Sequence, residues 1–170
     1  MKEYHVEFET KRDFLIKRDK EILAVIIFPD KTILVSRKDH YPKDVYRLTT
    51  GGIKKNEKPE EALKREIYEE TGITEMRFKP LALINYKIKN GKCIKDYQTY
   101  AYVVNVEEQN ITVMDPDENI SDFKRVNIRE FQNLTKILGS LKLIDKSETP
   151  WDEWGKFRKI AHDITIELIE

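Results

Sequence analysis

The sequence contains one cysteine, Cys93, in 170 residues. A single cysteine cannot form an internal disulfide, so disulfides do not hold this fold together. The first residues also lack the basic stretch followed by an apolar stretch that is typical of a secretory signal peptide. Together these absences predict a reducing, cytoplasmic setting. Since the sequence indicates no acid or base beside Cys93, we expect this thiol to be a packing residue.

Long apolar runs and an excess of one charge are absent as well. The longest apolar run, residues 22–28, is much shorter than the roughly 20 residues that cross a bilayer. The 31 Lys and Arg residues balance 31 Asp and Glu residues, which leaves a formal net charge of zero. We therefore expect no membrane partner and no nucleic-acid partner. A chain of 170 residues suits a single domain, residues 1–170, with its own core.

The first part of the sequence predicts a sheet. Residues 4–9 alternate weakly between polar and apolar, as in an edge strand, whereas residues 22–28 are continuously apolar, which is typical of a strand covered on both faces. Residues 32–35 and 46–48 predict two further strands, with a polar loop at residues 39–44 between them.

A long antiparallel hairpin is predicted in the middle of the chain. Its strands are residues 81–89 and 94–106, and Asn90-Gly91 separates them. Asn-Gly favours the positive φ angles that tight hairpin turns require. The aromatic residues of this hairpin are more typical of packing on a sheet face than of stacking on a base. They are Tyr86, Tyr97, Tyr100 and Tyr102.

The last third of the sequence predicts an acidic loop at residues 114–122, a short strand at residues 123–126, and helices at residues 128–138 and about 151–169. The final helix carries apolar residues at helical spacing: Trp151, Trp154, Phe157, Ile160, Ala161, Ile164 and Leu168. This stripe indicates core packing, with a homodimer contact as the second interpretation.

The most informative segment is residues 51–73. Residues 59–70 are rich in helix formers, with Pro59 suited to the first helical position and Gly72 to the stop. Three carboxylates at positions i, i+3 and i+4 share one face of this helix. They are Glu66, Glu69 and Glu70.

Carboxylates crowded in this way favour a bound cation. Two negative charges about 6 Å apart repel by roughly 3 kcal/mol at an effective dielectric near 20. Carboxylate oxygen is the ligand that Mg²⁺ and Mn²⁺ prefer, and Mg²⁺ commonly shares its other positions with water and substrate phosphates. The alternative is a solvated acidic helix face whose carboxylates pair with Lys64 and Arg65.

The spacing of this segment resembles the Nudix box at all of its nine constrained positions. A chance match to such a pattern in a chain of this length is on the order of one in ten million, which decides against the solvated face. The positions are Gly51, Glu57, Arg65, Glu66, Ile67, Glu69, Glu70, Gly72 and Ile73. The chain is thereby identified as a member of the Nudix hydrolase family.

The resemblance implies an α/β fold, namely an α/β/α sandwich around a central mixed sheet. It also implies roles for the motif residues. Glu66, Glu69 and Glu70 resemble the metal-binding carboxylates of the family. Glu57 resembles the residue that orients the site and binds a further ion through water. Arg65 resembles the arginine that forms an ion pair with Glu57 and positions the acidic helix.

The implied reaction is attack of water on a phosphorus atom of a diphosphate, assisted by Mg²⁺ or Mn²⁺. Gly51 and Gly52 are candidates for substrate binding, because a glycine lets backbone approach a phosphate closely. The resemblance leaves two candidates for the general base, Glu66 and Glu118. The second lies in the acidic loop at residues 114–122, where a solvated turn is the alternative interpretation.

Several residues outside the motif are weaker candidates. Arg37 and Arg47 suit phosphate recognition, with a surface charge as the alternative. His40 and His162 are more typical of solvated or structural histidines than of catalytic ones.

Two residues depart from the usual family pattern. Lys58 stands where many relatives have a Ser or Thr helix cap. Asn56 replaces a frequent glycine, but asparagine tolerates the left-handed backbone conformation.

The implied substrate is a small nucleotide. The Thr50-Gly51-Gly52-Ile53 segment is similar to sugar-nucleotide members of the family, which makes a nucleoside diphosphate sugar such as ADP-ribose the first choice. Cleavage of nucleoside triphosphates is the second enzymatic interpretation. A catalytically silent nucleotide sensor is the third, although such proteins generally lose box carboxylates and this sequence keeps them.

Overall fold

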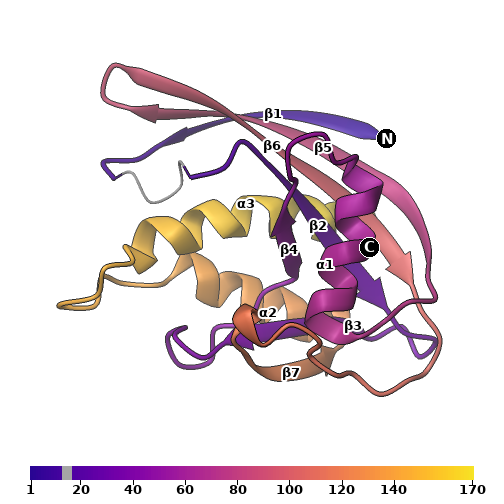
Figure 1. Cartoon of the computed structure of the whole chain (residues 1–170). Coiled ribbons are helices and arrows are strands. Elements are labelled where there is room, and N and C mark those ends of the chain that lie inside the picture. Colours follow the sequence, from indigo (N-terminus) through magenta and orange to yellow (C-terminus); the bar gives the residue numbers. More distant parts are fainter. Residues whose placement is uncertain (13–16) are drawn as a thin grey trace.

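The computed structural model describes residues 1–12 and 17–170 (Figure 1). In the described residues a seven-stranded sheet has the order β1-β5-β6-β2-β3-β7, and β4 pairs with β2 beside β3. The strands are β1 (Lys2–Glu9), β2 (Lys20–Ile27), β3 (Ile33–Lys38), β4 (Thr49–Gly52), β5 (Arg77–Asn90), β6 (Cys93–Asn105) and β7 (Ile120–Val126). The β1/β5 and β2/β6 pairs are parallel and the others are antiparallel, so the sheet is mixed.

Helices cover the sheet on both faces (Figure 1). They are α1 (Pro59–Thr71), α2 (Ile128–Gly139) and α3 (Trp151–Ile169), and a short 3-10 helix, η1 (Pro116–Glu118), precedes β7. Leu23 and Val25 of β2 pack in the cluster that contains Phe157 of α3, whereas Ile22 and Ala24 pack in the cluster that contains residues of α1. Alternate residues of one strand therefore face two cores, which explains the continuous apolar run and confirms the predicted sandwich.

The predicted helices are present, and so are the predicted strands except the one at residues 46–48; several strand ends differ by a few residues, and β5 begins at Arg77, four residues before its predicted start. Residues 46–48 do not form a strand; Arg47 makes only an isolated bridge with Ser36, and the strand is β4, directly after them. β7 begins at Ile120, three residues before the predicted strand. The reason is that the last residue of β3, Lys38, pairs with Ile120. None of the helices in the described part of the chain is long and apolar enough to span a membrane.

The hairpin turn lies one residue further on than predicted. Asn90 pairs with Cys93, so the two turn residues are Gly91 and Lys92. Only Gly91 among these residues has a positive φ, 61°, as in a tight turn with glycine at its first central position. Cys93 is exposed at this tip, so the prediction that its thiol packs inside the protein is wrong. The hairpin extends there beyond the part of the sheet that the helices cover (Figure 1).

Helix α1 is a well-anchored platform. Leu63 and Ile67 are fully buried against the sheet. Gly72 ends the helix in the left-handed conformation, with φ 74°, and its N–H donates to Tyr68 O. At the other end the backbone N–H of Lys58 donates to the Glu61 carboxylate at 2.9 Å. A side chain of the first turn therefore accepts a hydrogen bond from one of the free N–H groups at the start of the helix, although no Ser or Thr cap is present.

Candidate active site

A cavity of about 520 Å³ opens beside the acidic face of α1. Glu66 lines it from α1, Gly51 and Gly52 line it from β4, and Glu118 lines it from η1. The motif therefore forms one wall of a cavity whose other parts come from distant segments of the chain.

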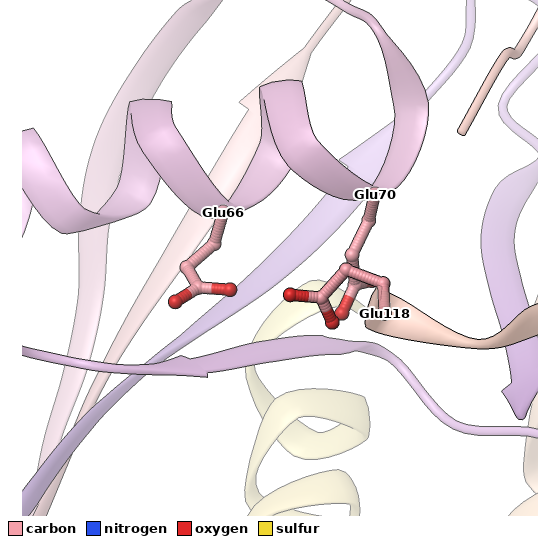
Figure 2. A group of neighbouring side chains, drawn as sticks. All are labelled: Glu66, Glu70 and Glu118. Atoms are coloured by element: carbon pink, nitrogen blue, oxygen red, sulfur yellow. The ribbon is translucent and has the colours of Figure 1, made fainter. Parts of the chain in front are cut away.

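Carboxylates from α1 and η1 converge at this wall (Figure 2). Oxygen atoms of Glu66, Glu70 and Glu118 lie within 4.8 Å of one another, and so do oxygen atoms of Glu69, Asp115 and Glu118. The structure brings together the three predicted carboxylates of the helix and the predicted Glu118. Asp115 belongs to the same arrangement, and its place in the acidic loop was the only sequence signal that pointed to it. An all-oxygen set of this kind suits a hard divalent cation.

The loop that carries Glu118 is attached to the end of α1. The backbone N–H groups of Met114 and Asp115 both donate to Glu69 O at 3.0 Å, and Thr112 N–H donates to Thr71 O at 2.9 Å. These bonds satisfy carbonyl groups that the last turn of a helix leaves free. Glu118 is further held by an ion pair with Lys38, at 3.2 Å. Its carboxylate is therefore fixed relative to the helix.

Glu70 is a buried carboxylate that is only partly satisfied by its neighbours. The residue is 0% exposed, and burial raises the pKa of its carboxyl group, although Arg47 opposes this. Arg47 Nη2 lies 3.5 Å from Glu70 Oε1, whereas Oε2 is buried with no hydrogen-bond partner. Since an unsatisfied buried carboxylate oxygen is unfavourable, a cation coordinated here would remove that deficit.

Gly51 has a role that its sequence position did not reveal. A Cβ atom added at Gly51 would lie 1.8 Å from Cδ of Glu66. The Glu66 side chain thus occupies the space beside the glycine, and only glycine allows it to lie there. Burial raises the pKa of Glu66 to about 7, although the neighbouring Arg65 lowers it in part.

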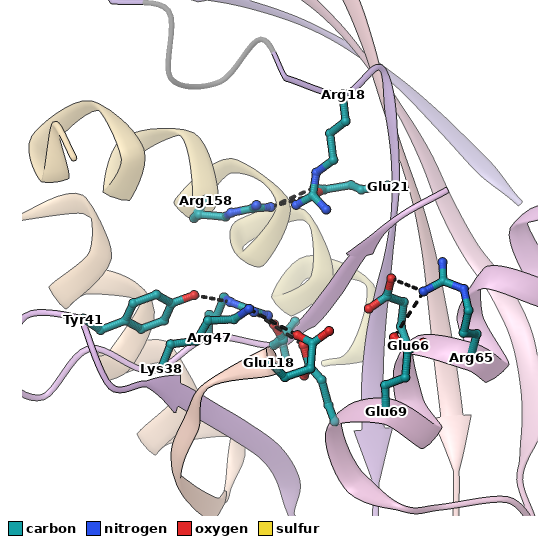
Figure 3. Close-up of polar contacts among 12 residues, drawn as sticks. Arg18, Glu21, Lys38, Tyr41, Arg47, Arg65, Glu66, Glu69, Glu118 and Arg158 are labelled. Carbon is teal, nitrogen blue, oxygen red and sulfur yellow. Dashed lines mark hydrogen bonds and ion pairs between the residues drawn. The ribbon is translucent and has the colours of Figure 1, made fainter. Parts of the chain in front are cut away.

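Arg65 binds two carboxylates of its own helix, Glu66 and Glu69 (Figure 3), and also connects the helix to the motif loop. It makes two hydrogen bonds to the Glu57 carboxylate, Nε to Oε1 at 2.7 Å and Nη2 to Oε2 at 3.0 Å. Nη1 also donates to Glu66 at 2.6 Å and Glu69 at 3.2 Å, and Nη2 donates to Gly52 O at 2.8 Å. Mainly through Arg65, the pKa of Glu57 falls to about 2. The ion pair expected between Arg65 and Glu57 is present.

The two weaker arginine candidates are in different places. Arg47 lines the cavity and is 3% exposed, with Nε donating to Tyr41 Oη at 2.6 Å and Nη1 to Leu48 O at 2.7 Å. It is therefore not a surface charge. Arg37 does not line the cavity, and its Nη2 donates to the backbone oxygens of Tyr41 and Pro42. Arg37 is therefore held by this loop.

Of the two candidate histidines, His40 lines the cavity and His162 does not. His162 is 1% exposed, and its Nε2 accepts a hydrogen bond from Leu48 N–H at 3.1 Å. Burial lowers its pKa to about 3, so it is neutral and structural, as expected. His40 lines the cavity near the rings of Tyr41 and Trp151. The two tryptophans of the apolar stripe, Trp151 and Trp154, are buried in a core cluster but also reach the cavity.

Sequence reasoning missed the cavity residues on the α3 side. Arg158 lines the cavity, and its Nη1 bonds the Glu21 carboxylate of β2 (Figure 3). Arg18 lines the cavity as well and donates to the same carboxylate. These residues lie 137 and 3 positions from Glu21 in the sequence, and no local pattern predicts that α3 approaches β2 at this point.

The fold and the site together define a Nudix-type α/β/α sandwich, in which residues 51–73 provide a loop, a helix and a second loop beside a cavity. The profile of the NUDIX domain matches residues 17–150. The chain therefore belongs to the Nudix hydrolase family, as the motif predicted. A search of curated proteins found no match.

Solved structures share this fold at low sequence identity. A MutT NUDIX hydrolase from Burkholderia pseudomallei is 19% identical, with a TM-score of 0.59 over 91% of this chain and 99% of that one. The dihydroneopterin triphosphate pyrophosphohydrolase of E. coli is 17% identical, with a TM-score of 0.56 over 84% and 96%. The NUDIX domain of Shewanella oneidensis NrtR, solved with ADP ribose, is 16% identical, with a TM-score of 0.54 over 68% and 77%.

Proposed function

We propose that this Nudix hydrolase uses a divalent metal, Mg²⁺ with Mn²⁺ as a substitute, to hydrolyse a diphosphate linkage in a nucleoside diphosphate derivative. Two observations carry the proposal: oxygen atoms of Glu66, Glu70 and Glu118 lie within 4.8 Å of one another, and one oxygen of Glu70, Oε2, is buried without a hydrogen-bond partner. Two of these acids, Glu66 and Glu70, are buried and the third, Glu118, is half-buried, and placing them together is unfavourable unless a cation compensates their charge.

The residues fit the metal that the family implies. Glu66, Glu69, Glu70 and Glu118 would hold it, and Glu57 would keep Arg65 in place beside them. When bound, the cation neutralises phosphate charge and lowers the pKa of the attacking water. All of the protein ligands would be carboxylate oxygens. Mg²⁺ bound at such a site keeps its other coordination positions for water and phosphate.

The protein side chains would supply position and proton transfer. Arg65 fixes Glu66 and Glu69 through one nitrogen, Nη1, and this rigidity helps to hold the reacting groups in line. The base that accepts a proton from the attacking water is either Glu66 or Glu118. Both line the cavity, as a group that reaches the water must.

The first substrate to test is a sugar nucleotide such as ADP-ribose. The similarity of the Thr50-Gly51-Gly52-Ile53 segment to sugar-nucleotide members favours it, and the NrtR domain of the same fold was solved with ADP ribose. A nucleoside triphosphate is the second candidate. It is favoured by the two arginines, Arg18 and Arg158, on the α3 side of the cavity.

A hydrolysis screen with Mg²⁺ and Mn²⁺ tests this proposal across sugar nucleotides, nucleoside triphosphates, dinucleoside polyphosphates and coenzyme A esters. We expect release of a nucleoside monophosphate or of diphosphate, and a loss of at least about 100-fold in kcat for Glu69→Gln and Glu70→Gln. Glu60→Gln is the matched control, because Glu60 is an exposed acid in the first turn of the same helix. Tight nucleotide binding without turnover on any of these substrates would instead identify a sensor.

A further inference from the structure

A second polar cluster lies outside the Nudix motif, on the α3 side of the same cavity (Figure 3). Its centre is Glu21 of β2, whose side chain is 1% exposed. Glu21 accepts hydrogen bonds from Arg158 Nη1 at 2.9 and 2.8 Å, from Arg18 Nη2 at 3.2 Å and from Thr99 Oγ1 at 2.9 Å. Both oxygen atoms of this buried carboxylate therefore accept hydrogen bonds, and the carboxylate binds both arginines.

Arg158 keeps donor groups that the protein does not use. A guanidinium group carries five N–H donors, and both contacts with Glu21 come from Nη1. Nε is buried without a partner, and Nη2 donates no hydrogen bond to any residue of 1–12 or 17–170. The side chain is 11% exposed and lines the cavity. The buried Nε–H is thus left without an acceptor, and the two N–H groups of Nη2, which are not buried, remain available to a ligand in the cavity.

The charges of this cluster do not cancel. Two arginines share one carboxylate, and Lys17 lines the same cavity. Arg18 lies directly on β4, where its Nη1 would be 3.2 Å from a Cβ added at Gly52. Burial alone would raise the pKa of Glu21, but Arg158 and Arg18 lower it to about 2, so Glu21 is charged at neutral pH. Glu148 lines the cavity as well, so three basic side chains, Lys17, Arg18 and Arg158, stand against two carboxylates, Glu21 and Glu148, and this side of the cavity carries a net positive charge.

We infer that Arg158 and Arg18 form an anion subsite and that Glu21 is the positioning residue that holds it. The occupant is a phosphate group next to the scissile diphosphate, so the subsite favours the second candidate substrate, a nucleoside triphosphate, over the sugar nucleotide. Arginine binds phosphate through paired N–H groups, whereas a neutral sugar at this place would leave the donors unpaired. The inference rests on the proposed function, because it takes the scissile diphosphate to lie at the carboxylate wall of the same cavity.

Binding of two inert ligands tests this subsite without any need for turnover. Imidodiphosphate and diimidotriphosphate resist hydrolysis and differ by one phosphate unit. We expect calorimetry in the presence of Mg²⁺ to show that the wild-type protein binds the triphosphate analogue at least about tenfold more tightly, since each tenfold step is about 1.4 kcal/mol. Arg158→Met should abolish this preference while changing the affinity for imidodiphosphate by less than about twofold.

Three further variants separate recognition from stability. Arg158→Lys keeps the charge but not the fork of donors, so the preference should fall at least about threefold; it also carries the test if Arg158→Met does not fold. Glu21→Gln should reduce the preference too, because it frees both arginines although it makes the cavity more positive. Arg125→Met is the matched control, since Arg125 is also ion-paired, with Asp30 and Glu108, but does not line the cavity.

The outcomes distinguish this inference from the proposed function. An unchanged triphosphate preference in Arg158→Met or Arg158→Lys would overturn the subsite, and so would an equal loss of affinity for both analogues. A preference that depends on Arg158, together with no hydrolysis in the screen described above, would leave the subsite standing and refute the proposed activity. Hydrolysis in the screen together with a triphosphate preference that does not depend on Arg158 would support the proposed activity and refute the subsite.

Discussion

Replacing Gly51 by alanine tests whether Glu66 must occupy its observed place. The added Cβ atom would lie 1.8 Å from Glu66 Cδ and 2.2 Å from Cγ. Carbon atoms in contact are normally about 3.5–4.0 Å apart, so the carboxylate has to move by about 2 Å. A displacement of about 1 Å already costs on the order of 100-fold in rate where reacting groups must be aligned. We therefore expect kcat to fall at least about 100-fold for Gly51→Ala.

The same substitution should affect stability much less than activity. Glu66 reaches into a cavity, so its side chain has space to rotate, and overpacking of this kind costs about 1–3 kcal/mol. The assay combines steady-state hydrolysis of the best substrate from the screen, Mg²⁺ titration by calorimetry and thermal unfolding. Weaker Mg²⁺ binding should accompany the lower rate.

A neighbouring substitution provides the comparison. In Gly52→Ala the new Cβ would meet only Arg18, at 3.2 Å from Nη1 and 3.3 Å from Cδ, so this side chain has to shift slightly while Glu66 keeps its place. We expect a loss of less than about tenfold there. If Gly51→Ala retained the wild-type rate and Mg²⁺ affinity, Glu66 would not act from its observed position, and the assignment of the carboxylate wall would be refuted.

Three more predictions follow from the buried charges and the free thiol. In wild type, Mg²⁺ at 100 times its Kd should raise the free energy of unfolding by about 2.7 kcal/mol. In Glu70→Gln, Mg²⁺ should no longer raise Tm. Thermal unfolding of both proteins with and without Mg²⁺ checks this. Folding lowers the pKa of Glu21 from 4.5 to about 2, so its stabilising charge is fully present above about pH 4.5 and is lost as the pH falls toward 2. Glu21→Gln should therefore flatten the dependence of the free energy of unfolding on pH in this window, as followed by denaturant titrations; an unchanged slope would exclude Glu21 as its source. Cys93→Ser should change stability by less than about 0.5 kcal/mol, and a thiol reagent should modify Cys93 in the native protein without unfolding.

Local patterns predicted most of the fold. The continuous apolar run became the central strand β2, and the final helix occupies the expected residues, Trp151–Ile169. The errors occurred where tertiary pairing decides the outcome. β7 begins early because β3 extends to meet it, and the hairpin turn is set by the pairing of Asn90 with Cys93.

The candidate site was predictable where a local sequence pattern encodes its residues. The spacing of residues 51–73 gave the acidic helix face, and the acidic loop pointed to Glu118. In contrast, the environment of Arg158 depends on how α3 packs against β2, more than 100 residues away, because Arg158 and Glu21 are 137 positions apart. Likewise, the contact between Gly51 and Glu66 depends on the distance between β4 and α1. Sequence spacing does not report such distances.

The attachment of the η1 loop to the end of α1 has a consequence for how the proposed metal site is assembled. Glu69 O receives two backbone N–H groups from the loop, and Glu118 completes both groups of converging carboxylates. A synthetic peptide that spans residues 51–73 would carry every residue of the motif and still lack this ligand and the bonds that orient it. Such a peptide should chelate Mg²⁺ no better than any short acidic helix, because the ion-binding geometry is assembled only when the strand β7 has docked on β3.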